Sequence, residues 1–372
     1  MPAGKPAWQA KGLLYKARLT PCVRECDNGR VKPHIALLCL ALSLPLAPVL
    51  TGADSLDIYV LDMEGGKAMI VRGPAGDTMM VDGGTPGQQN DRDLKRVLAE
   101  AHALGIQQFD VVLTTHYDID HAGNVPAIAA HIPGKLYIDH GPAVNNPKIA
   151  SFNRKALDGY MAFIPGKNRR SVKPGDVIPM KGVRILVVSS REQVLAKPLQ
   201  GAGQPNAACP ASRPEPLELD DNSGSIGTIW EFGKFRMGDF GDLLGWVENR
   251  LVCPNNLIGK VDLFMVNHHG LAISNSPEFV AALDPKVAIM NNGEHKGGAP
   301  EVIRRLRAVA GFEDLWQLHY SLAARDLNAP ENYIANMKEE GCAGNLIKVS
   351  ARRDGSFTVT NMRNGFSKTY GK

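Results

Sequence analysis

Four side chains that could bind a divalent metal ion lie within six consecutive positions of the chain: His116, Asp118, Asp120 and His121. They directly follow the apolar run 109–113, which is typical of a buried strand, so they would stand in the loop at its end. Imidazole and carboxylate groups in such loops can hold divalent cations. The spacing therefore predicts a metal centre. A metal-bound water can become a nucleophile near neutral pH, and Asp120 could orient or deprotonate that water.

Further candidate residues occur later in the chain, each after another expected strand. Asp239 ends the stretch Met237-Gly-Asp239, and the adjacent His268 and His269 precede a glycine. His295 lies in a Gly-rich stretch, where it could donate a proton or a hydrogen bond to a substrate oxygen. A lone His in a loop is more often a solvated residue, so His295 carries less weight than the four residues above.

The elements that would position these residues alternate between strands and helices. Alternating or continuous apolar runs indicate strands, and apolar spacings of three and four indicate helices. Strands are expected at 56–61, 68–72, 78–81, 109–113, 135–138, 183–188, 227–232, 234–237, 261–266, 287–290, 346–350 and 356–361, and helices at 91–103, 125–131, 149–163, 243–248, 277–283 and 300–310. Two βαβ-like halves, each supplying loops at strand ends, fit an α/β fold built as a four-layer αβ/βα sandwich.

Residues 116–121, called the motif loop below, resemble the HxHxDH motif of metallo-β-lactamase-fold hydrolases, with Asp118 in place of the second His. The form HxDxDH is typical of the branch that resembles the soluble domain of the competence protein ComEC. Other matches follow in order: residues 62–68 resemble that branch's DVGQGD-type first turn, 80–84 its iDgG, 237–239 its tGD and 267–270 its HHG. The resemblance covers roughly residues 56–310 and implies a metallo-β-lactamase sandwich with hydrolase activity.

The resemblance also implies a role for each matching residue. His116 and Asp118 are expected to bind a first metal ion, and Asp120 and His121 a second. Asp239 is expected to be the carboxylate that bridges both ions.

The second ion should gain one more ligand from the adjacent histidines. His269, which directly precedes the glycine, is the preferred ligand, with His268 as the alternative. One or two divalent ions are thus implied, with zinc expected first. Manganese is the alternative, because Asp118 in place of a His makes the site harder.

One departure from the family pattern concerns the first ion. The fold usually supplies a further His from a loop before the bridging Asp, but no His occurs in residues 141–238. Asn222 or Ser225 could take that place, or His140 could reach in from its own strand end.

Two further carboxylates have open roles. Asp82, and Asp62 similarly, could support the motif loop as turn-capping residues or act directly.

The first 53 residues are expected to be a signal peptide or N-terminal leader. They hold seven Lys and Arg against two acidic side chains, and the apolar run 35–50 is short for a membrane span. Small residues at 51–53 then suit cleavage near Ala53. The protein is therefore expected to be exported, to the periplasm or the medium, with an uncleaved anchor as the alternative.

The rest of the chain is expected to form one large domain with additions. Residues 54–310 would be the metallo-β-lactamase-like domain, with an insertion at about 141–220 that shapes the substrate pocket. Residues 311–372 would be a C-terminal extension that packs on it and contains a β-hairpin. Three cysteines remain beyond the leader, Cys209, Cys253 and Cys342, and an exported chain could pair two of them in any combination.

Fold alone does not determine the substrate. The ComEC-like resemblance favours phosphodiester, nuclease-like substrates. The alternatives are a lactone, ester or β-lactam hydrolase on the same metal site, and a non-catalytic binding domain with a degenerate site. Lys167, Arg169, Arg170 or Lys296 at the metal cleft would favour phosphate, whereas an apolar rim would favour esters and lactams.

The charge distribution limits the kinds of substrate and partner that are expected. The net charge is +4, but the basic leader accounts for it and the rest of the chain carries about −1. Non-specific nucleic-acid binders use a broad basic field that releases counterions, and the chain after the leader lacks this excess. A small-molecule or oligomeric substrate is therefore expected, with membrane contact only through an uncleaved leader.

Overall fold

The computed structural model describes residues 54–88, 90–144, 151–211 and 220–371, all within the unit Leu50–Lys372. The expected leader, residues 1–53, lies outside the described residues, as do parts of the expected insertion. In the described part of the chain, no helix is both long and apolar enough to cross a membrane.

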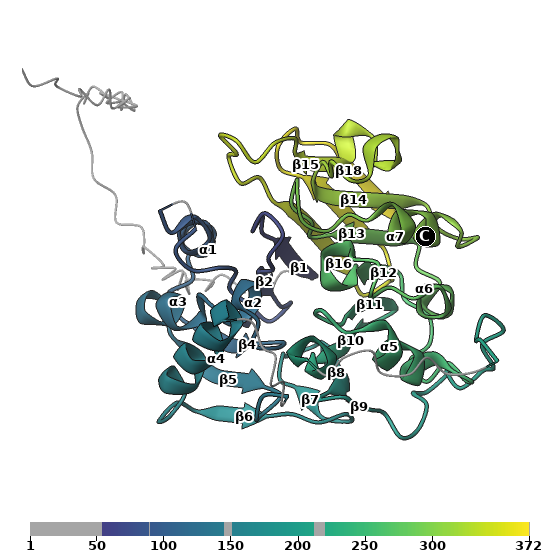
Figure 1. Cartoon of the computed structure of the whole chain (residues 1–372), viewed down its shortest axis with the longest axis horizontal. Coiled ribbons are helices and arrows are strands. Elements are labelled where there is room, and N and C mark those ends of the chain that lie inside the picture. The colour runs from purple at the N-terminus through teal and green to yellow at the C-terminus, as the bar shows by residue number, and fades with distance from the viewer. Residues whose placement is uncertain (1–53, 89, 145–150, 212–219, 372) are drawn as a thin grey trace, which may run out of the picture. The chain divides into compact units, whose positions relative to one another are not determined.

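Two large β-sheets form the centre of the fold (Figure 1). The first sheet has the strand order β18-β17-β16-β1-β2-β3-β4-β5-β6. These strands span, in that order, Ser367–Tyr370, Phe357–Asn361, Ile347–Arg352, Ser55–Val60, Met69–Arg72, Thr78–Val81, Phe109–Leu113, Gly134–Asp139 and Arg169–Ser171.

The second sheet has the order β15-β14-β13-β12-β11-β10-β8-β7, and β9 pairs with β8. Its strands span, in that order, Ile334–Asn336, Asp314–His319, Val287–Met290, Leu263–Met265, Phe235–Asp239, Gly227–Phe232, Arg184–Ser190 and Val177–Ile178, with β9 at Gln193–Val194. Strands β11 to β15 run parallel to one another, as do β3 to β6 in the first sheet.

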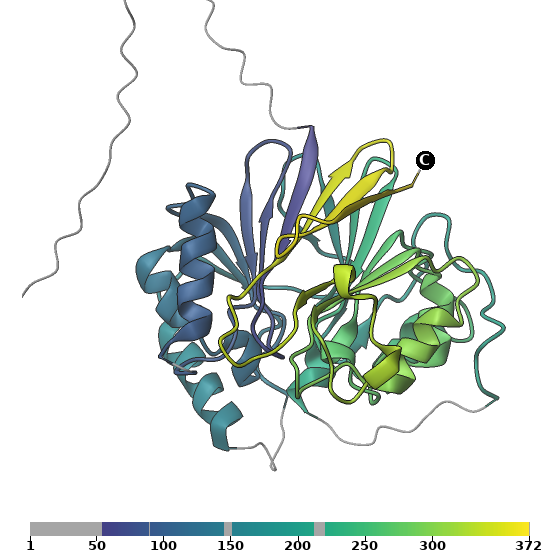
Figure 2. The same ribbon diagram turned by 90° about the horizontal axis from the view of Figure 1, so that it is seen from above.

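Helices cover the outer face of each sheet, and the sheets face each other between them (Figure 2). The first sheet carries α1 (Arg92–Ala103), α3 (Val125–His131) and α4 (Ser151–Phe163), and the second carries α5 (Gly245–Val252), α6 (Pro277–Leu283) and α7 (Pro300–Arg307). Shorter helical turns are α2 (Ile119–Ala122), η1 (Asp221–Gly224), η2 (Asn267–Gly270), η3 (Arg325–Leu327) and η4 (Glu331–Tyr333). The predicted four-layer sandwich is therefore confirmed.

The side-chain pattern of β1 explains why layers form on both faces. Leu56, Ile58 and Val60 pack in the core between the sheets, whereas Tyr59 and Leu61 pack under the helices of the first sheet. Successive side chains of a strand point to opposite faces, so a strand that is apolar on both faces needs cover on both.

The C-terminal residues contribute to both sheets. The strand β14 and its neighbour β15 extend the second sheet, and β16 pairs antiparallel with β1 in the first. The predicted hairpin forms as β16 and β17, and β18 adds a third strand. Residues beyond 310 are thus continuous with both sheets and do not form a separate layer.

The insertion expected at 141–220 supplies α4 and the edge strands β6 to β9 in its described parts. Cys209 within it is joined to Cys253 by a disulfide bond, which ties this segment to the end of α5. Cys342 is the free cysteine of the described residues.

Candidate metal centre

Two residues separate the end of β4 from the motif loop, and Asp82, just after β3, holds this loop in place. The carboxylate of Asp82 accepts hydrogen bonds from the backbone N–H and the hydroxyl of Thr115, each at 2.8 Å. It also accepts one from Nδ1 of His121 at 2.9 Å. Because Nδ1 carries the proton of that bond, Nε2 of His121 is the atom that can bind a metal ion. Asp82 therefore supports the motif loop.

Four side chains, two of them from this loop, each offer one potential ligand atom within 4.8 Å of the others: Asp120, His121, Asp242 and His269. They are called the His/Asp cluster below. Oδ2 of Asp242 lies 3.2 Å from Nε2 of His121 and 3.1 Å from Nε2 of His269. Oδ2 of Asp120 lies 3.0 Å from Nε2 of His269. Three of the four are buried, and Asp120 is partly exposed.

The electrostatics of the cluster favour a bound cation. Burial would lower the pKa of His121, but the carboxylates of Asp242 and Asp82 outweigh it and raise that pKa well above its usual value. Burial would raise the pKa of Asp242, yet the imidazoles of His121 and His269 hold it well below its usual value. Oδ1 of Asp242 is buried without a hydrogen-bond partner. Mixed imidazole and carboxylate donors with an unsatisfied buried oxygen fit a divalent ion such as zinc or manganese.

The two residues expected to bind a first ion, His116 and Asp118, lie near the cluster. Among the described residues, neither belongs to a group of three or more side chains that could hold a metal ion together. His116 is fully buried, and burial lowers its pKa to about 3, so its imidazole is neutral. Its Nε2 has no hydrogen-bond partner. Burial and the neighbouring Asp120 raise the pKa of Asp118 to about 8.

The expected bridging residue, Asp239, lies outside the cluster, and Asp242 lies inside it. Asp239 is the last residue of β11, and its buried carboxylate forms an ion pair with Lys67. The chain then turns at Gly241, whose φ is 58°, and brings Asp242 to the two imidazoles. The repeat of Gly-Asp at 238–239 and 241–242 is the sequence signal that points to Asp242.

The structure brings His269 into the cluster and places His268 at its edge. Nδ1 of His269 lies 3.2 Å from the backbone oxygen of Asn291, so its Nε2 faces the carboxylates. His268 lies 3.6 Å from Asp242 through Nε2, and its Nδ1 contacts the hydroxyl of Ser274 at 3.1 Å. Both histidines have positive φ, 52° and 54°, which non-glycine residues adopt rarely and which often marks a functional site.

The residues considered in place of the missing His make other contacts. His140 is buried and its Nε2 lies 3.2 Å from Asp221. Asp221 also accepts the backbone N–H of Tyr117, so this pair braces the motif loop from the side. Ser225 accepts the backbone N–H of Asp242 at 3.2 Å, and Asn222 forms part of the turn η1.

His295 is exposed and lies near the carboxylates of Glu294 and Glu339, apart from the His/Asp cluster. Its neighbour Lys296 reaches the cluster instead. The ammonium of Lys296 lies 2.5 Å from Oδ2 of Asp120.

The part of the chain that contains the motif loop is similar to known proteins. A family model described as the metallo-beta-lactamase superfamily matches residues 62–195, which include the first turn and the motif loop. This part of the chain is therefore similar to metallo-β-lactamase domains. ComE operon protein 3 of Bacillus subtilis (strain 168) is 30% identical over 195 residues, which are 52% of this chain and 21% of that protein. The chain thus spans about a fifth of the length of that relative.

Solved structures similar to this chain include YhfI of Bacillus subtilis, a metallo-β-lactamase fold protein, with 9% identity and a TM-score of 0.42 over 70% of this chain and 96% of that one. Another is Igni18, a metallo hydrolase from the archaeon Ignicoccus hospitalis, with 13% identity and a TM-score of 0.36 over 78% and 98% of the two chains.

A pocket of about 540 Å³ opens beside the His/Asp cluster at Asp120. Lys296 and Arg92 line it, and so do the apolar side chains of Ile119 and Phe152. Arg92 is already paired with Glu64, which lines the same pocket.

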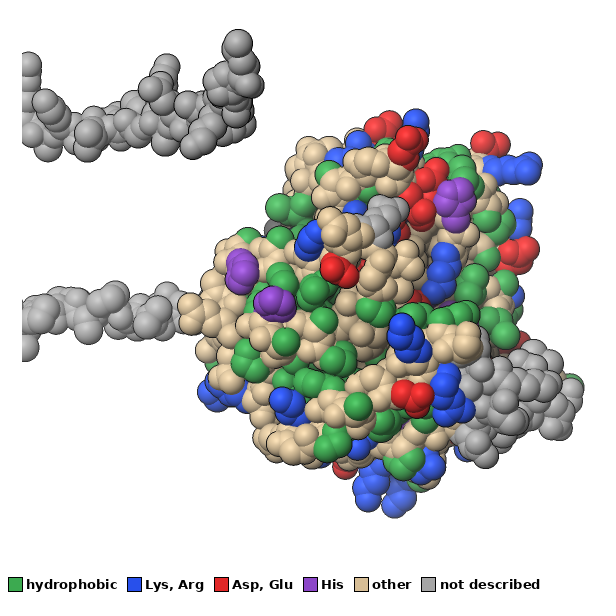
Figure 3. All heavy atoms as spheres, turned by 60° about the vertical axis from the view of Figure 1, so that its left-hand side comes forward, with side chains coloured by type: hydrophobic (Ala, Val, Ile, Leu, Met, Phe, Trp, Pro, Cys, Tyr) green, Lys and Arg blue, Asp and Glu red, His purple; other side chains and the backbone are tan. Residues whose placement is uncertain are grey.

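The basic cluster expected near the cleft lies elsewhere. Arg169 forms an ion pair with Asp139 at 2.7 Å, and Lys167 lies over the ring of Phe163. Arg170 is exposed and donates to a backbone oxygen in β7. On the face drawn in Figure 3, Lys and Arg side chains are interspersed with acidic, apolar and uncharged ones.

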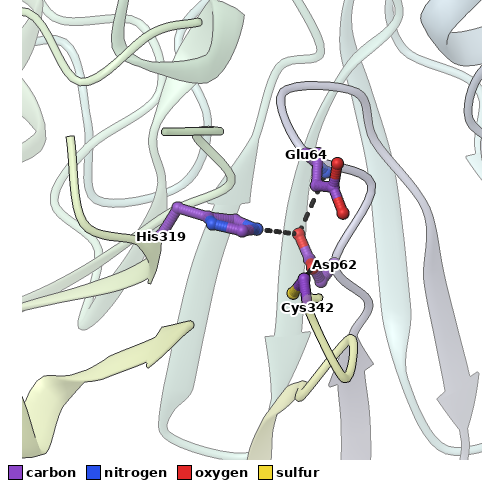
Figure 4. Close-up of side chains that lie close together, drawn as sticks. All are labelled: Asp62, Glu64, His319 and Cys342. Carbon is purple, nitrogen blue, oxygen red and sulfur yellow. Dashed lines mark hydrogen bonds and ion pairs between the residues drawn. The ribbon is translucent and has the colours of Figure 1, made fainter. Parts of the chain in front are cut away.

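A second group of titratable residues joins the first turn to the C-terminal strands (Figure 4). Oδ1 of Asp62 lies 2.7 Å from Nε2 of His319 at the end of β14, and Oδ2 of Asp62 accepts the thiol of Cys342 at 3.3 Å. Arg96 binds Asp62 at 2.9 Å and Glu64 at 3.0 Å. The guanidinium groups of Arg96 and Arg92 pair with these carboxylates, so the group links separate segments of the chain. Glu64 also lines the pocket beside Asp120. In the sequence, His319 carries no signal beyond that of a structural histidine.

Proposed function

We propose that this chain is an exported metal-dependent hydrolase that cleaves phosphodiester bonds in a small or oligomeric substrate. One observation carries the proposal: the His/Asp cluster meets the pocket at Asp120, and the ammonium of Lys296 stands at that same point. A set of metal ligands beside a pocket with a cation suits the hydrolysis of an anionic ester.

In this proposal the His/Asp cluster holds a divalent ion, zinc in the first place and manganese as the alternative. Such an ion would supply a Lewis acid that activates water and neutralises charge on the attacked group. Asp120 is the cluster member that is exposed to the pocket, so its carboxylate orients the attacking water. Lys296, and not His295, then contacts the substrate. Its ammonium, which is paired with Asp120 in the free protein, would bind a phosphate oxygen of the substrate instead.

A second candidate function rests on the apolar part of the pocket. Phe152 lines the pocket and is 55% exposed, and Ile119 lies beside Asp120. These side chains suit an uncharged ester or lactone, which needs no cation for binding. The same metal centre would serve either reaction.

Export is supported by the disulfide bond between Cys209 and Cys253. Disulfides persist in oxidising compartments and are rare in the cytosol.

The experiment that tests the proposal combines metal content with turnover. The purified protein is reconstituted with zinc or manganese and its hydrolysis of bis-p-nitrophenyl phosphate is compared with that of p-nitrophenyl acetate and a lactone. We expect metal to bind and the phosphodiester to be cleaved, with activity lost in Asp120→Ala and Asp242→Ala. Asp158→Ala on the exposed face of α4 is the control and should retain full activity.

Other results of this experiment would favour a different function. Turnover of the acetate or lactone alone would favour the second candidate. Metal binding without turnover of any of these substrates would contradict both hydrolase readings and favour a binding domain.

A further inference from the structure

Glu248, in the middle of α5, is a buried carboxylate that does not belong to the His/Asp cluster. Its side chain is fully buried, and no ion pair joins it to a Lys, Arg or His among the residues that the structure describes. Burying a carboxylate is costly unless its oxygens accept hydrogen bonds. The donors that face Glu248 therefore show which part of the chain it stabilises.

The hydrogen bonds that Glu248 accepts in the described part of the chain all come from the loop that carries the two adjacent histidines. This loop, residues 267–276, is called the histidine loop below. Oε1 of Glu248 accepts from Nδ2 of Asn267 and from the backbone N–H of Asn275, each at 2.7 Å. Oε2 accepts the backbone N–H of Ser276 at 2.8 Å. One carboxylate thus binds both ends of the histidine loop.

The two ends of the histidine loop also bind each other. The backbone N–H of Asn267 donates to Oδ1 of Asn275 at 3.0 Å, and Nδ2 of Asn275 donates to the backbone oxygen of Asn267 at 2.9 Å. Arg305 on α7 donates to the backbone oxygens of Ser274 at 3.1 Å and Asn275 at 3.0 Å. The loop is therefore closed on itself and held by side chains from two helices, α5 and α7.

The backbone of the histidine loop requires such restraint. His268 and His269 have φ values of 52° and 54°, and Asn275 has 59°, in the left-handed region that residues other than glycine adopt rarely. Residues in such conformations persist only where the surrounding contacts determine them. Because Glu248 supplies contacts at both ends of this loop, the direction in which His269 points depends on Glu248.

The carboxylate form of Glu248 suits its three donors. Both oxygens of a carboxylate accept hydrogen bonds and neither donates one, whereas a glutamine would turn an NH₂ group towards one of the N–H donors. Burial raises the pKa of Glu248 to about 7, and the backbone N–H groups of Ser276 and Asn275 oppose this rise. At pH 8 the side chain is therefore mostly ionised.

We propose that Glu248 is a positioning residue of the metal centre, which fastens both ends of the histidine loop and thereby holds His269 against Asp242. Nε2 of His269 lies 3.1 Å from Oδ2 of Asp242. The same loop also joins the turn that presents Asp242, because the backbone N–H of His268 donates to the backbone oxygen of Gly241 at 3.1 Å. The inference rests on the proposed metal centre, on which Glu248 acts through the histidine loop.

Zinc affinity at pH 8 tests this inference without relying on activity. Wild type and Glu248→Gln are compared by competition with a chromophoric chelator, and thermal melts show whether each protein is folded. We expect Glu248→Gln to bind zinc about 10–100-fold more weakly, as is typical when an outer partner of a metal ligand is lost. The visible spectrum of its Co²⁺ complex should also differ from that of wild type, because His269 is no longer held in place.

Two controls separate positioning from a general loss of stability. Glu301→Gln makes the same change at an exposed position of α7 and should bind zinc as wild type does. Val349→Ala shortens a buried side chain of β16 in the core between the sheets. This variant should have a lower melting temperature than wild type and the same zinc affinity.

Hydrogen exchange in the metal-free wild type needs no variant, so it decides the question if Glu248→Gln does not fold. The backbone amides of Asn275 and Ser276 should be protected, because they donate to a buried carboxylate. Rapid exchange at both amides would overturn the inference, and so would wild-type zinc affinity in a folded Glu248→Gln. Either result would leave the metal centre intact. Failure of the wild type to bind zinc would contradict the metal centre itself, and with it both the inference and the proposed function.

Discussion

Oδ2 of Asp242 lies 3.1 Å from Nε2 of His269, across two loops that follow neighbouring parallel strands. The same oxygen lies 3.2 Å from Nε2 of His121 in the other sheet's motif loop. This carboxylate therefore joins the two halves of the sandwich at the proposed metal centre, although Asp239 occupies the position that the family motif suggests.

Asp242 should matter more for metal binding than Asp239 does. Asp242→Asn is expected to weaken zinc affinity by at least about 100-fold, because it removes a charged ligand that faces both imidazoles. Asp239→Asn should lower thermal stability, because it leaves the buried Lys67 unpaired, while zinc affinity changes by less than about 10-fold. Chelator competition and thermal melts separate the two effects, and the reverse ranking of affinities would contradict the assignment.

Asp82 should act on the metal through His121. Asp82→Asn keeps the size of the side chain but weakens the bond that holds Nδ1 of His121. Loss of such an outer partner typically lowers metal affinity by about 10–100-fold. The change is measured by zinc competition, with Asp158→Ala as a control that should bind zinc as wild type does. Unchanged affinity in a folded Asp82→Asn protein would rule out this role.

Lys296 and Phe152 should divide the substrate classes between them. Lys296→Met is expected to lower kcat/KM for bis-p-nitrophenyl phosphate by about 10–100-fold, because a hydrogen bond to a charged group contributes about 1.5–3 kcal/mol. The same variant should leave turnover of a neutral ester within about 3-fold, and Phe152→Ala should show the opposite pattern. Equal losses on both substrates in Lys296→Met would indicate that Lys296 acts on Asp120 alone.

The pair of His319 and Asp62 should make stability depend on pH. Burial alone would lower the pKa of His319, but the hydrogen bond that its imidazole donates to Asp62 leads the effects that raise that pKa to about 9. A pKa above the unfolded value of 6.5 contributes stability below pH 6.5, and that stability is lost as the pH rises through 9. The free energy of unfolding should therefore fall by up to about 3 kcal/mol between these values.

Denaturant unfolding at several pH values measures this slope. It is best followed in a Cys342→Ser background, since the thiol of Cys342 also donates a hydrogen bond to Asp62. His319→Gln in that background should show a flatter profile. A slope that persists unchanged in His319→Gln would assign the pH dependence to another group.

Much of the fold follows from local patterns in the sequence. The helices α1, α6 and α7 place apolar residues at spacings of three and four, and β1 is apolar on both faces, so their types are predictable from side-chain burial. Strand β14 was not predicted, although Leu315, Trp316 and Leu318 are apolar. This segment forms a strand because it pairs with β13, and a strand is stabilised by its neighbours in the sheet.

The same division holds for the site. The motif loop and the pair His268-His269 were identified from residue types and spacing, because these ligands are close together in the chain. Asp242, Lys67 and His319 were not, because their roles arise from contacts between residues that are far apart in sequence. Whether a carboxylate faces an imidazole or a lysine depends on how a turn directs its side chain.

By itself, the sequence determined that a ligand-rich loop follows a buried strand in an α/β sandwich, because ligand spacing and apolar periodicity are local properties. Only the tertiary structure decided which carboxylate joins the imidazoles. The turn at Gly241 carries Asp242 to His121 and His269, while burial beside Lys67 keeps Asp239 paired. That choice depends on the packing of the two sheets and on the cost of leaving a buried charge unpaired, which no local pattern records.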